Sequence, residues 1–438
     1  MLTQEVAVVP SPATLLGQPL GQRRILLDGQ SPRSWGDGMV VFAADPVATL
    51  VITAETAASS DPLTELQRFT DLWTARGCAG VLVALSYELK HWIERLPRRH
   101  RWPAVPLLYA AAYPWAYQAN RRVGRAAIVA GDSARLADGQ RFLAQSSSTR
   151  ESPVRLAPLE AVMTRPAYME MVERAKEFIA AGDIYQANLA HSFHAAVSGD
   201  CAPELFARWT TRFPAPFAAY VDGGDWTLLS NSPECLLDIR ERSIATYPIK
   251  GTRRVAPGAD VARLAADLAG DPKDLAEHLM IVDLERNDLG RICVPGSVVV
   301  SSLQEVVEFP LLLHMVSRVA GHLREGIGLA DIVRATFPGG SITGAPKVRA
   351  MEIIEELEPA PRGFYTGSVG WVEPGGRARF NICIRTAVLS DGGLSYHAGG
   401  GIVADSDPLR EYEETFAKAQ SLCEVLAEPG SEVRPAVR

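Results

Sequence analysis

The chain has 438 residues, of which 47% are apolar and 22% are charged, and its formal net charge is −7. This length exceeds one ordinary core and this composition excludes a disordered chain, so we expect two packed lobes or an unusually large single fold. A pI near 5.7 disfavours nucleic acid as the main partner, and no apolar run reaches the roughly 20 residues that a membrane span requires.

The first residues and the cysteines indicate the cellular compartment that we expect for the protein. The first residues, "MLTQEVAVVPSPATLL", lack the basic and apolar regions of a signal peptide. Six cysteines are scattered without any C-x-x-C pair, which argues against a disulfide framework or a zinc site. We therefore expect a cytoplasmic protein without a membrane partner.

The first third of the chain mixes strand and helix patterns. "MVVFAADPVATLVIT" and "GVLVALSYEL" have strand character, and "DPLTELQRFTDLWTARG" has a helical pattern that Gly77 ends. The polar stretch 131–153 predicts a connection between two parts of the chain. We assign residues 1–150 to an N-terminal lobe and residues 158–430 to a larger catalytic domain.

The second part begins with a helix followed by several strands. Residues 164–182 carry an apolar stripe at helical spacing, with Thr164 at the cap position and Gly182 at the end. "IYQANLAHSF" then alternates, so that Ala187 lies on one face and Gln186 on the other. Further strands follow in a run rather than in alternation with helices, which favours an α+β architecture.

One strand end, "YPIKGTRRV", places Lys250 in an apolar setting. A lysine amine is a nucleophile only when neutral, so a catalytic role would require burial or nearby cations to lower its pKa from about 10.4. Glu234, 16 residues upstream, is a carboxyl that could act as an acid. Spacing and pattern alone indicate a surface lysine at position 250.

Two predicted helices carry acidic pairs three residues apart. Asp274 and Glu277 lie on one turn of the first helix, and Glu411 and Glu414 on one turn of the second. Two such helices could hold Mg²⁺ between them, because this ion binds a few carboxylates together with water and substrate oxygens. The alternative is that both are ordinary solvated faces.

Two glycine-rich segments and two isolated polar residues complete the candidates. "FPGGSITGAPKVRAM" leads into a helix and could bind an anion, or could be a tight turn, but Ala345 stands where a P-loop requires lysine. "YHAGGGIVADSD" allows close approach of a ligand or a sharp bend. His314 and Arg385 lie within apolar runs, and a buried arginine needs an anionic partner.

Together these segments resemble the chorismate-utilising enzymes, strongly over residues 160–427 and more loosely before them. The resemblance is carried by "GDIYQANLAHSF", "SPECLL", "PIKGT", "EHLMIVDLERNDLGRI", "FPGGSITGAPKVRAMEII", "GFYTGSVGW", "IRTA" and "AGGGIVADSDPLREYEETFAKA", in the family's order. It implies an α+β fold in which antiparallel sheets pack as a sandwich with helices outside. It also implies binding of chorismate and Mg²⁺.

Within this family, the lysine of "PIKGT" is typical of the branch that replaces the C4 hydroxyl of chorismate with an amino group, on the way to 4-aminobenzoate and folate. The resemblance makes Lys250 the nucleophile at C2, Glu234 the general acid and His314 a residue near the reacting carbon. Relatives that attack with water have a lysine that we align with Ala187, so its absence points to an amine nucleophile.

The resemblance also implies the binding residues. Glu277 and Glu414 would hold Mg²⁺, with Asp274 and Glu411 as outer or water-mediated ligands. The positions that grip the substrate would be Thr343, Tyr365, Arg385, Gly399, Gly400, Gly401 and Lys418. Ammonia would come from a separate glutamine amidotransferase subunit, because Cys78 lacks the glycine that such a nucleophile elbow requires.

Three alternatives remain open at this point. The branch that forms anthranilate shares the fold, metal and substrate, and carries alanine in place of Lys250. A pyridoxal phosphate enzyme would use Lys250 as a Schiff base and the "GGSITG" loop as a phosphate cup. A non-catalytic subunit that only senses an amino acid would bind without turnover.

Overall fold

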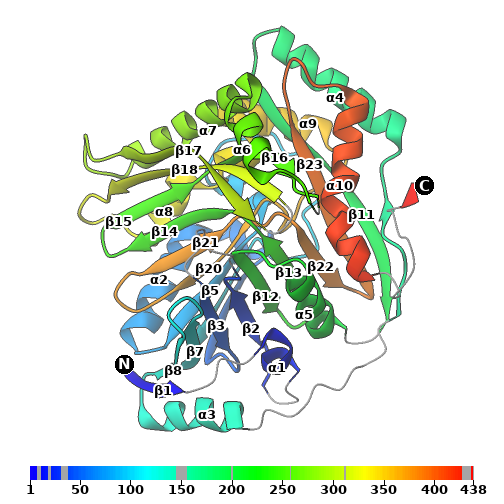
Figure 1. The fold of residues 1–438 in the computed structure, drawn as a ribbon. Coiled ribbons are helices and arrows are strands. Elements are labelled where there is room, and N and C mark those ends of the chain that lie inside the picture. Colours follow the sequence, from blue (N-terminus) through cyan, green and yellow to red (C-terminus); the bar gives the residue numbers. More distant parts are fainter. Residues whose placement is uncertain are drawn as a thin grey trace.

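Two β-sheets lie face to face at the centre of the protein, with helices on their outer sides (Figure 1). This computed structural model describes the chain except for residues 7–10, 18–20, 31–37, 145–154, 199–200, 257, 310–311, 427–435 and 438. Almost all strand pairs are antiparallel, as in the short pairing of β11 with β19, and β10 with β24 is a parallel pair. The predicted α+β sandwich is therefore confirmed.

Within the described residues, the first sheet has 14 strands and the second has 10. The first contains, in spatial order, β1 (Leu2–Val6), β8 (Arg125–Ala130), β7 (Trp115–Asn120), β3 (Met39–Ala43), β2 (Ile25–Asp28), β12 (Phe217–Asp222), β13 (Trp226–Ser232), β22 (Thr386–Ser390), β23 (Gly393–Ile402), β11 (Gln186–Ser198), β10 (Glu160–Ala161) and β24 (Ala436–Val437), with β19 (Gly344–Ala345) and β9 (Arg155–Leu156) beside β11. The second contains β16 (Ile249–Arg254), β18 (Leu312–His322), β15 (Ser243–Tyr247), β14 (Cys235–Arg240), β21 (Ala378–Asn381), β20 (Ser368–Val372), β5 (Gly80–Leu85), β6 (Leu108–Tyr113) and β4 (Ala48–Ile52), with β17 (Val299–Phe309) beside β18.

The helices connect these strands over the outside of the sheets. They are α1 (Pro12–Leu16), α2 (Pro62–Ala75), α3 (Ser133–Ala144), α4 (Arg165–Ala180), α5 (Ala202–Arg212), α6 (Val261–Ala269), α7 (Pro272–Gly290), α8 (Leu329–Thr336), α9 (Lys347–Leu357) and α10 (Pro408–Leu426), with 3₁₀ turns η1 (Thr56–Ala58), η2 (Tyr87–Trp92) and η3 (Gly340–Ile342). None of the helices in the described ranges is both long and apolar enough to cross a membrane.

Three apolar clusters explain why the layers stack in this order. One lies between the sheets and joins side chains such as Val41 and Leu228 of the first sheet to Leu82 and Trp371 of the second. A second packs α1, α3, α5 and α10 on the first sheet, and a third packs α2, α4, α7 and α8 largely on the second. Each sheet thus buries both faces, which is the arrangement expected of a helix–sheet–sheet–helix sandwich.

The N-terminal and C-terminal parts of the chain contribute to both sheets. β2 pairs with β12, and β5 pairs with β20, so strands far apart in sequence lie side by side. Part of the predicted connection 131–153 is the helix α3, in which Phe142 packs against Phe42 and Trp115. The part of the connection after α3, residues 145–153, lies outside the described ranges. The division at residue 150 stays a prediction.

The helices that border the site form for the reasons that the sequence indicates. Tyr168, Val172 and Ala175 are the buried stripe of α4, although the Thr164 side chain makes no capping hydrogen bond. At the start of α7, the Asp271 side chain accepts hydrogen bonds from the backbone N–H groups of Lys273 and Asp274. These caps and stripes orient one face of each helix toward the sheets.

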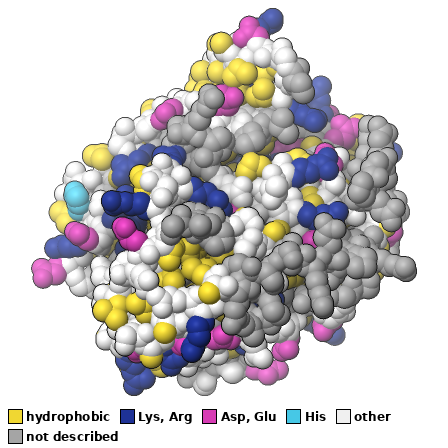
Figure 2. Space-filling model, turned by 60° about the horizontal axis from the view of Figure 1, so that its bottom comes forward, with side chains coloured by type: hydrophobic (Ala, Val, Ile, Leu, Met, Phe, Trp, Pro, Cys, Tyr) yellow, Lys and Arg dark blue, Asp and Glu magenta, His cyan; other side chains and the backbone are white. Residues whose placement is uncertain are grey.

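β11 and β23 form the longest strand pair beside the site. Their antiparallel register runs from Ala187 opposite Ile402 to Ala196 opposite Gly393. Gly399, Gly400 and Gly401 therefore lie opposite Ala190, Leu189 and Asn188. On the outer face of the molecule in Figure 2, Lys and Arg side chains are interspersed with Asp and Glu.

Candidate functional site

Lys250 lies on β16 opposite Met315 of β18. The next residue, Gly251, has a φ of +69°, and the strand register shifts between Lys250 and Thr252. The Lys250 amine ends close to β23, because its Nζ is 3.1 Å from where a Cβ on Gly401 would be. Burial lowers the pKa of this amine, with the Lys418 ammonium acting in the same direction.

Three carboxylates oppose that shift without reversing it. Glu277, Glu234 and Glu414 each favour the charged form of Lys250 through their own charge. They come from α7, the β13–β14 turn and α10, so three separate elements converge on one amine. The result is a lysine that loses its proton more readily than a lysine in water, which a nucleophilic amine requires.

Glu234 is almost fully buried, with 3% of its surface exposed. Burial raises its pKa to about 7, while the Ser341 hydroxyl and the Lys250 charge lower it. Within the described residues, its Oε1 atom has no hydrogen-bond partner. A carboxyl that keeps its proton near neutral pH and has one oxygen free can donate that proton to a ligand.

His314 is a buried, neutral imidazole. Its Nδ1 lies 3.0 Å from the Thr252 hydroxyl, and its Nε2 has no partner among the residues that the structure describes. Burial lowers its pKa to about 3, and the Arg385 guanidinium contributes to this. The free nitrogen is available to a ligand, whereas the bonded one orients the ring.

The C-terminal acidic helix α10 brings two carboxylates toward the glycine run, Glu411 and Glu414. A Cβ on Gly400 would lie 2.9 Å from Glu411 Oε2 and 3.8 Å from Glu414 Oε1. Burial raises the pKa of Glu411 and of Glu277, whereas the Lys418 ammonium, 2.7 Å away, lowers the pKa of Glu414. The ionised forms of Glu411 and Glu277 are thus destabilised by burial, and a bound cation would stabilise them.

Asp274 and Lys418 have partners within the protein. Asp274 forms an ion pair with Arg253 at 2.9 Å, which leaves it turned toward β16. Lys418 donates a hydrogen bond to the Gly399 carbonyl at 2.7 Å in addition to its pair with Glu414. In the described ranges, no three acidic, histidine or cysteine side chains surround one point closely enough to hold a metal by themselves.

The remaining candidates border the same region. Thr343 is fully buried and its hydroxyl donates to the Gly339 carbonyl at 2.9 Å. The Tyr365 ring stacks on His397, with 5.3 Å between the ring centres. Arg385 has a left-handed φ of +49°, its pKa is lowered by burial, and no carboxylate in the described residues pairs with it. Arg385 is therefore a cation available to an anionic ligand.

The glycine-rich segment before α9 is folded more tightly than the sequence suggests. Gly340–Ile342 form the 3₁₀ turn η3, and Gly344 and Ala345 pair with Ala187 and Gln186 of β11. α9 begins only after Pro346, which occupies its N-cap position. The segment is a fixed wall of the site rather than an open phosphate loop.

Gln186 is a site residue that the sequence reasoning missed. Its side chain is fully buried, and neither its Nε2 nor its Oε1 has a partner among the described residues. Its Nε2 lies 2.6 Å from where a Cβ on Gly401 would be, next to the Lys250 amine. An unpaired buried amide at this place points to a ligand that satisfies it.

Ala187 is the position that we aligned with the lysine of relatives that attack with water. Its side chain packs in an apolar cluster with Ala350 and Ile353. Because successive strand residues point to opposite faces, the residue beside Lys250 is Gln186. The alternation of polar and apolar residues in "IYQANLAHSF" was the signal that could have identified it.

A second buried carboxyl, Glu285 of α7, also escaped the sequence reasoning. It accepts a hydrogen bond from the Thr246 hydroxyl at 2.5 Å, and burial raises its pKa to about 8. Glu285 follows Glu277 by about two turns of α7, so the helical spacing could have indicated that both side chains lie on the same side of the helix. It lies behind Glu234, whose charge raises its pKa further.

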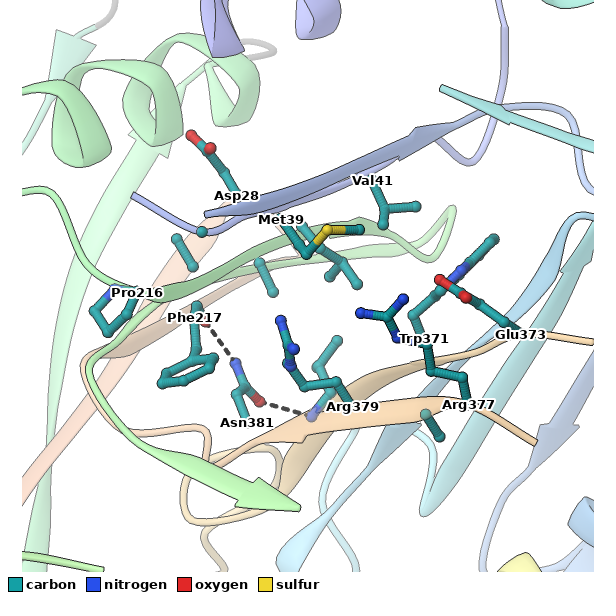
Figure 3. A pocket seen from close by; sticks show the side chains of 16 residues that line it. Asp28, Met39, Val41, Pro216, Phe217, Trp371, Glu373, Arg377, Arg379 and Asn381 are labelled. Atoms are coloured by element: carbon teal, nitrogen blue, oxygen red, sulfur yellow. Dashed lines mark hydrogen bonds between the residues drawn. The ribbon is translucent and has the colours of Figure 1, made fainter. Parts of the chain in front are cut away.

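A separate pocket lies toward the N-terminal part of the chain (Figure 3). Its lining includes Met39, Phe217, Trp371 and Arg379, and Asn381 crosses it with hydrogen bonds to Phe217 and Val369. None of the candidate catalytic or metal residues lines this pocket. It is distinct from the region around Lys250.

Comparison with known proteins adds an independent finding. A family model described as chorismate binding enzyme matches residues 22–424. The chain is 38% identical over 409 residues to aminodeoxychorismate synthase component 1 of Salmonella typhimurium, covering 88% of this chain and 89% of that protein. It is 44% identical over 266 residues to anthranilate synthase component 1 of Aquifex aeolicus, covering 60% and 53%.

A solved structure agrees with the fold. The crystal structure of anthranilate synthase component I from Streptococcus pneumoniae TIGR4 superposes with a TM-score of 0.77 at 26% sequence identity. The superposition covers 90% of this chain and 93% of that one. The chain therefore shares the overall fold of that protein.

The approach of Gly401 to Lys250 generates a first prediction. Gly401→Ala would place a methyl group against Gln186 Nε2 and Lys250 Nζ, so we expect the rate of chorismate consumption to fall by about 100-fold through misplacement of these groups. The control is Gly290→Ala, at the end of α7, where a Cβ meets nothing within 4 Å. Equal rates for the two variants, at matched thermal midpoints, would contradict this geometry.

Proposed function

Because this chain belongs to the chorismate binding enzyme family, we propose that it is an aminodeoxychorismate synthase component I. It would convert chorismate and ammonia to 4-amino-4-deoxychorismate, a transfer of nitrogen that places it with the transaminases. The observation that carries the proposal is the Lys250 amine, whose pKa is lowered and which lies among Glu234, Glu277 and Glu414.

The proposed reaction has two displacements. The neutral Lys250 amine forms a bond to C2 of chorismate, both ring double bonds shift, and the C4 hydroxyl leaves as water with the proton of Glu234. Ammonia then forms a bond to C4, both double bonds shift back, and the bond from C2 to Lys250 breaks. The new C4 ammonium loses one proton and Lys250 leaves as a neutral amine, so the net change is chorismate plus ammonia to product plus water. The pyruvyl ether is retained, so no pyruvate is released.

The surrounding residues support this reaction by binding and orientation. The two carboxylates of chorismate match the free cation of Arg385 and the neighbourhood of Lys418, while Tyr365 offers an aromatic surface. The Gln186 amide can hydrogen-bond the substrate beside the Lys250 amine. Thr343 and the backbone of Gly399, Gly400 and Gly401 would close the remaining sides of the site.

Mg²⁺ fits the carboxylates that converge here. Glu277 and Glu414 would supply hard oxygen ligands from two helices, with Glu411 as an outer or water-mediated ligand, and the ion would offset the charge of a substrate carboxylate. Asp274 is held by Arg253 and would act only at a distance. Since the protein groups alone do not complete a site, substrate oxygens would contribute to it.

The nitrogen source is proposed to be a glutamine amidotransferase. The similar proteins of Salmonella typhimurium and Escherichia coli are each named component 1, which implies a second component for them. We propose that such a subunit supplies ammonia to this chain and that the product leads to 4-aminobenzoate and folate in the cytoplasm.

The product assay tests the function directly. Incubated with chorismate, Mg²⁺ and ammonium, the purified chain should form 4-amino-4-deoxychorismate, identified by mass spectrometry. Lys250→Ala should reduce this product by at least about 100-fold because the nucleophile is lost. Arg286→Ala, which removes an exposed cation of α7 that pairs with the exposed Asp283, should not change it. Anthranilate together with pyruvate as the products would instead assign the chain to the other amination reaction.

The pH dependence follows from Glu234. Its pKa is raised to about 7, so the protonated form that donates to the leaving hydroxyl is lost as the pH rises through that value. Because Lys250 must be neutral while Glu234 is protonated, we expect kcat/KM to fall about tenfold per pH unit once the pH exceeds the pKa values of both groups. Glu234→Gln should remove this alkaline limb and leave a slow rate that rises as Lys250 loses its proton, whereas Asp283→Asn, at an exposed position of α7, should keep the wild-type profile. An unchanged limb in Glu234→Gln would refute the acid assignment.

The metal ligands have a separate test. Glu277→Gln and Glu414→Gln remove one charged oxygen each, so we expect the Mg²⁺ concentration for half-maximal rate to rise by about tenfold or more. Calorimetry of Mg²⁺ binding in the presence of chorismate should show the same loss. Glu413→Gln, the exposed neighbour on α10, is the matched control. Wild-type Mg²⁺ dependence in both site variants would exclude these ligands.

A further inference from the structure

Arg362 is a buried arginine that no step of the proposed reaction uses. It lies in the segment between α9 and β20 and only 3% of its surface is exposed. Its Nε and Nη2 donate to the two oxygens of Glu358 at 2.9 and 2.7 Å. This bidentate pair fixes the plane of the guanidinium, because its donors match the carboxylate oxygens.

The other donors of Arg362 bind two elements that form the site wall. Its Nη2 also donates to the Asn188 carbonyl of β11 at 2.5 Å, and its Nη1 donates to the Ile342 carbonyl of η3 at 3.2 Å. The Asn188 N–H in turn donates to the Thr343 carbonyl at 2.8 Å. The guanidinium thus joins β11 to the glycine-rich segment at Ile342, the residue before Thr343.

Glu358 extends the same connection along β11. Its Oε1 accepts a hydrogen bond from the Ala190 N–H at 2.8 Å. Ala190 lies opposite Gly399 in the β11–β23 pair. The Arg362–Glu358 pair therefore holds Asn188 and Ala190, which flank the residue opposite Gly400, and so sets where the glycine run lies.

The backbone and hydroxyl contacts of Arg362 reach two further regions. Its carbonyl accepts the Tyr365 N–H at 3.1 Å, and its Nη1 also donates to the Thr366 hydroxyl at 3.1 Å. Its own N–H donates to Glu88 Oε1 at 2.7 Å, and its guanidinium lies 4.6 Å from the centre of the Tyr87 ring. η2 of the N-terminal part is thereby tied to the site wall.

From this arrangement we propose that Arg362 is a positioning residue, which holds β11, the segment around Thr343 and Tyr365 in the geometry that binds chorismate. Its five N–H groups are matched by five contacts to Glu358, Asn188, Ile342 and Thr366. With its donors used within the protein, Arg362 acts through its neighbours rather than on the substrate. The inference rests on the proposed function, since it takes Thr343, Tyr365 and the glycine run as the substrate contacts.

The test is the effect of Arg362→Lys on chorismate consumption by the full chain with Mg²⁺ and ammonium. A lysine keeps the charge but cannot reach both carbonyls and Glu358, so we expect KM for chorismate to rise by about tenfold or more and kcat/KM to fall by about 100-fold. Arg349→Lys on α9, whose arginine pairs with Asp183 and Glu352 at a partly exposed position, is the matched control and should keep both constants.

A second variant covers the case in which Arg362→Lys fails to fold. The double substitution Arg362→Met with Glu358→Gln removes both charges together, so no buried charge is left unpaired. It should fold, as measured by its thermal midpoint and near-ultraviolet circular dichroism, and should show the same rise in KM. A folded variant with wild-type KM and only a smaller active fraction would overturn the positioning role.

Chorismate consumption also keeps this result separate from the identity of the product. If the wild-type chain makes anthranilate, the proposed function fails, but the KM comparison between Arg362→Lys and Arg349→Lys still decides the inference. If the product is 4-amino-4-deoxychorismate and KM does not change, the function stands and the positioning role is refuted.

Discussion

The site depends on one amine that is removed from water while several carboxylates face it. Burial alone would lower the pKa of Lys250 but would leave an expensive charge whenever the amine is protonated. The charges of Glu277, Glu234 and Glu414 limit that cost, and the Lys418 ammonium acts the other way. The balance leaves an amine that loses its proton more readily than an exposed lysine, as the proposed nucleophile requires.

The close approach of these groups requires glycine in β23. A side chain at Gly400 would occupy the place of the Glu411 carboxylate, and a side chain at Gly401 would occupy the places of Gln186 and Lys250. At Gly399 the limit is the backbone itself, because a Cβ would lie 2.2 Å from the Leu189 carbonyl oxygen. The absence of side chains on one strand is thus what allows α10, β11 and β16 to meet.

The helices and strands around the site could be predicted from the sequence, but which side of each one lies toward Lys250 could not. The stripe of Tyr168, Val172 and Ala175 predicted α4, and the alternation of "IYQANLAHSF" predicted β11. That same alternation was compatible with either face lying toward Lys250. In the structure Ala187 lies in an apolar cluster, and Gln186 lies beside Lys250. Similarly, the polar stretch 131–153 predicted a connection, although part of it is α3, which buries Phe142. A polar surface on a short helix looks like a loop when its packing partners are unknown.

The sequence by itself determined the family, the α+β class and the residue types that meet at the site, because motif order, capping and periodicity are local properties of the chain. Only the tertiary structure decided the contacts between segments far apart in the sequence. Asp274 pairs with Arg253, and Arg362 donates to the Asn188 and Ile342 carbonyls, whereas Glu414–Lys418 and Glu358–Arg362 are pairs at i,i+4 spacing. Burial and charge separation depend on the distances between segments far apart in sequence, and spacing along the chain carries no information about those distances.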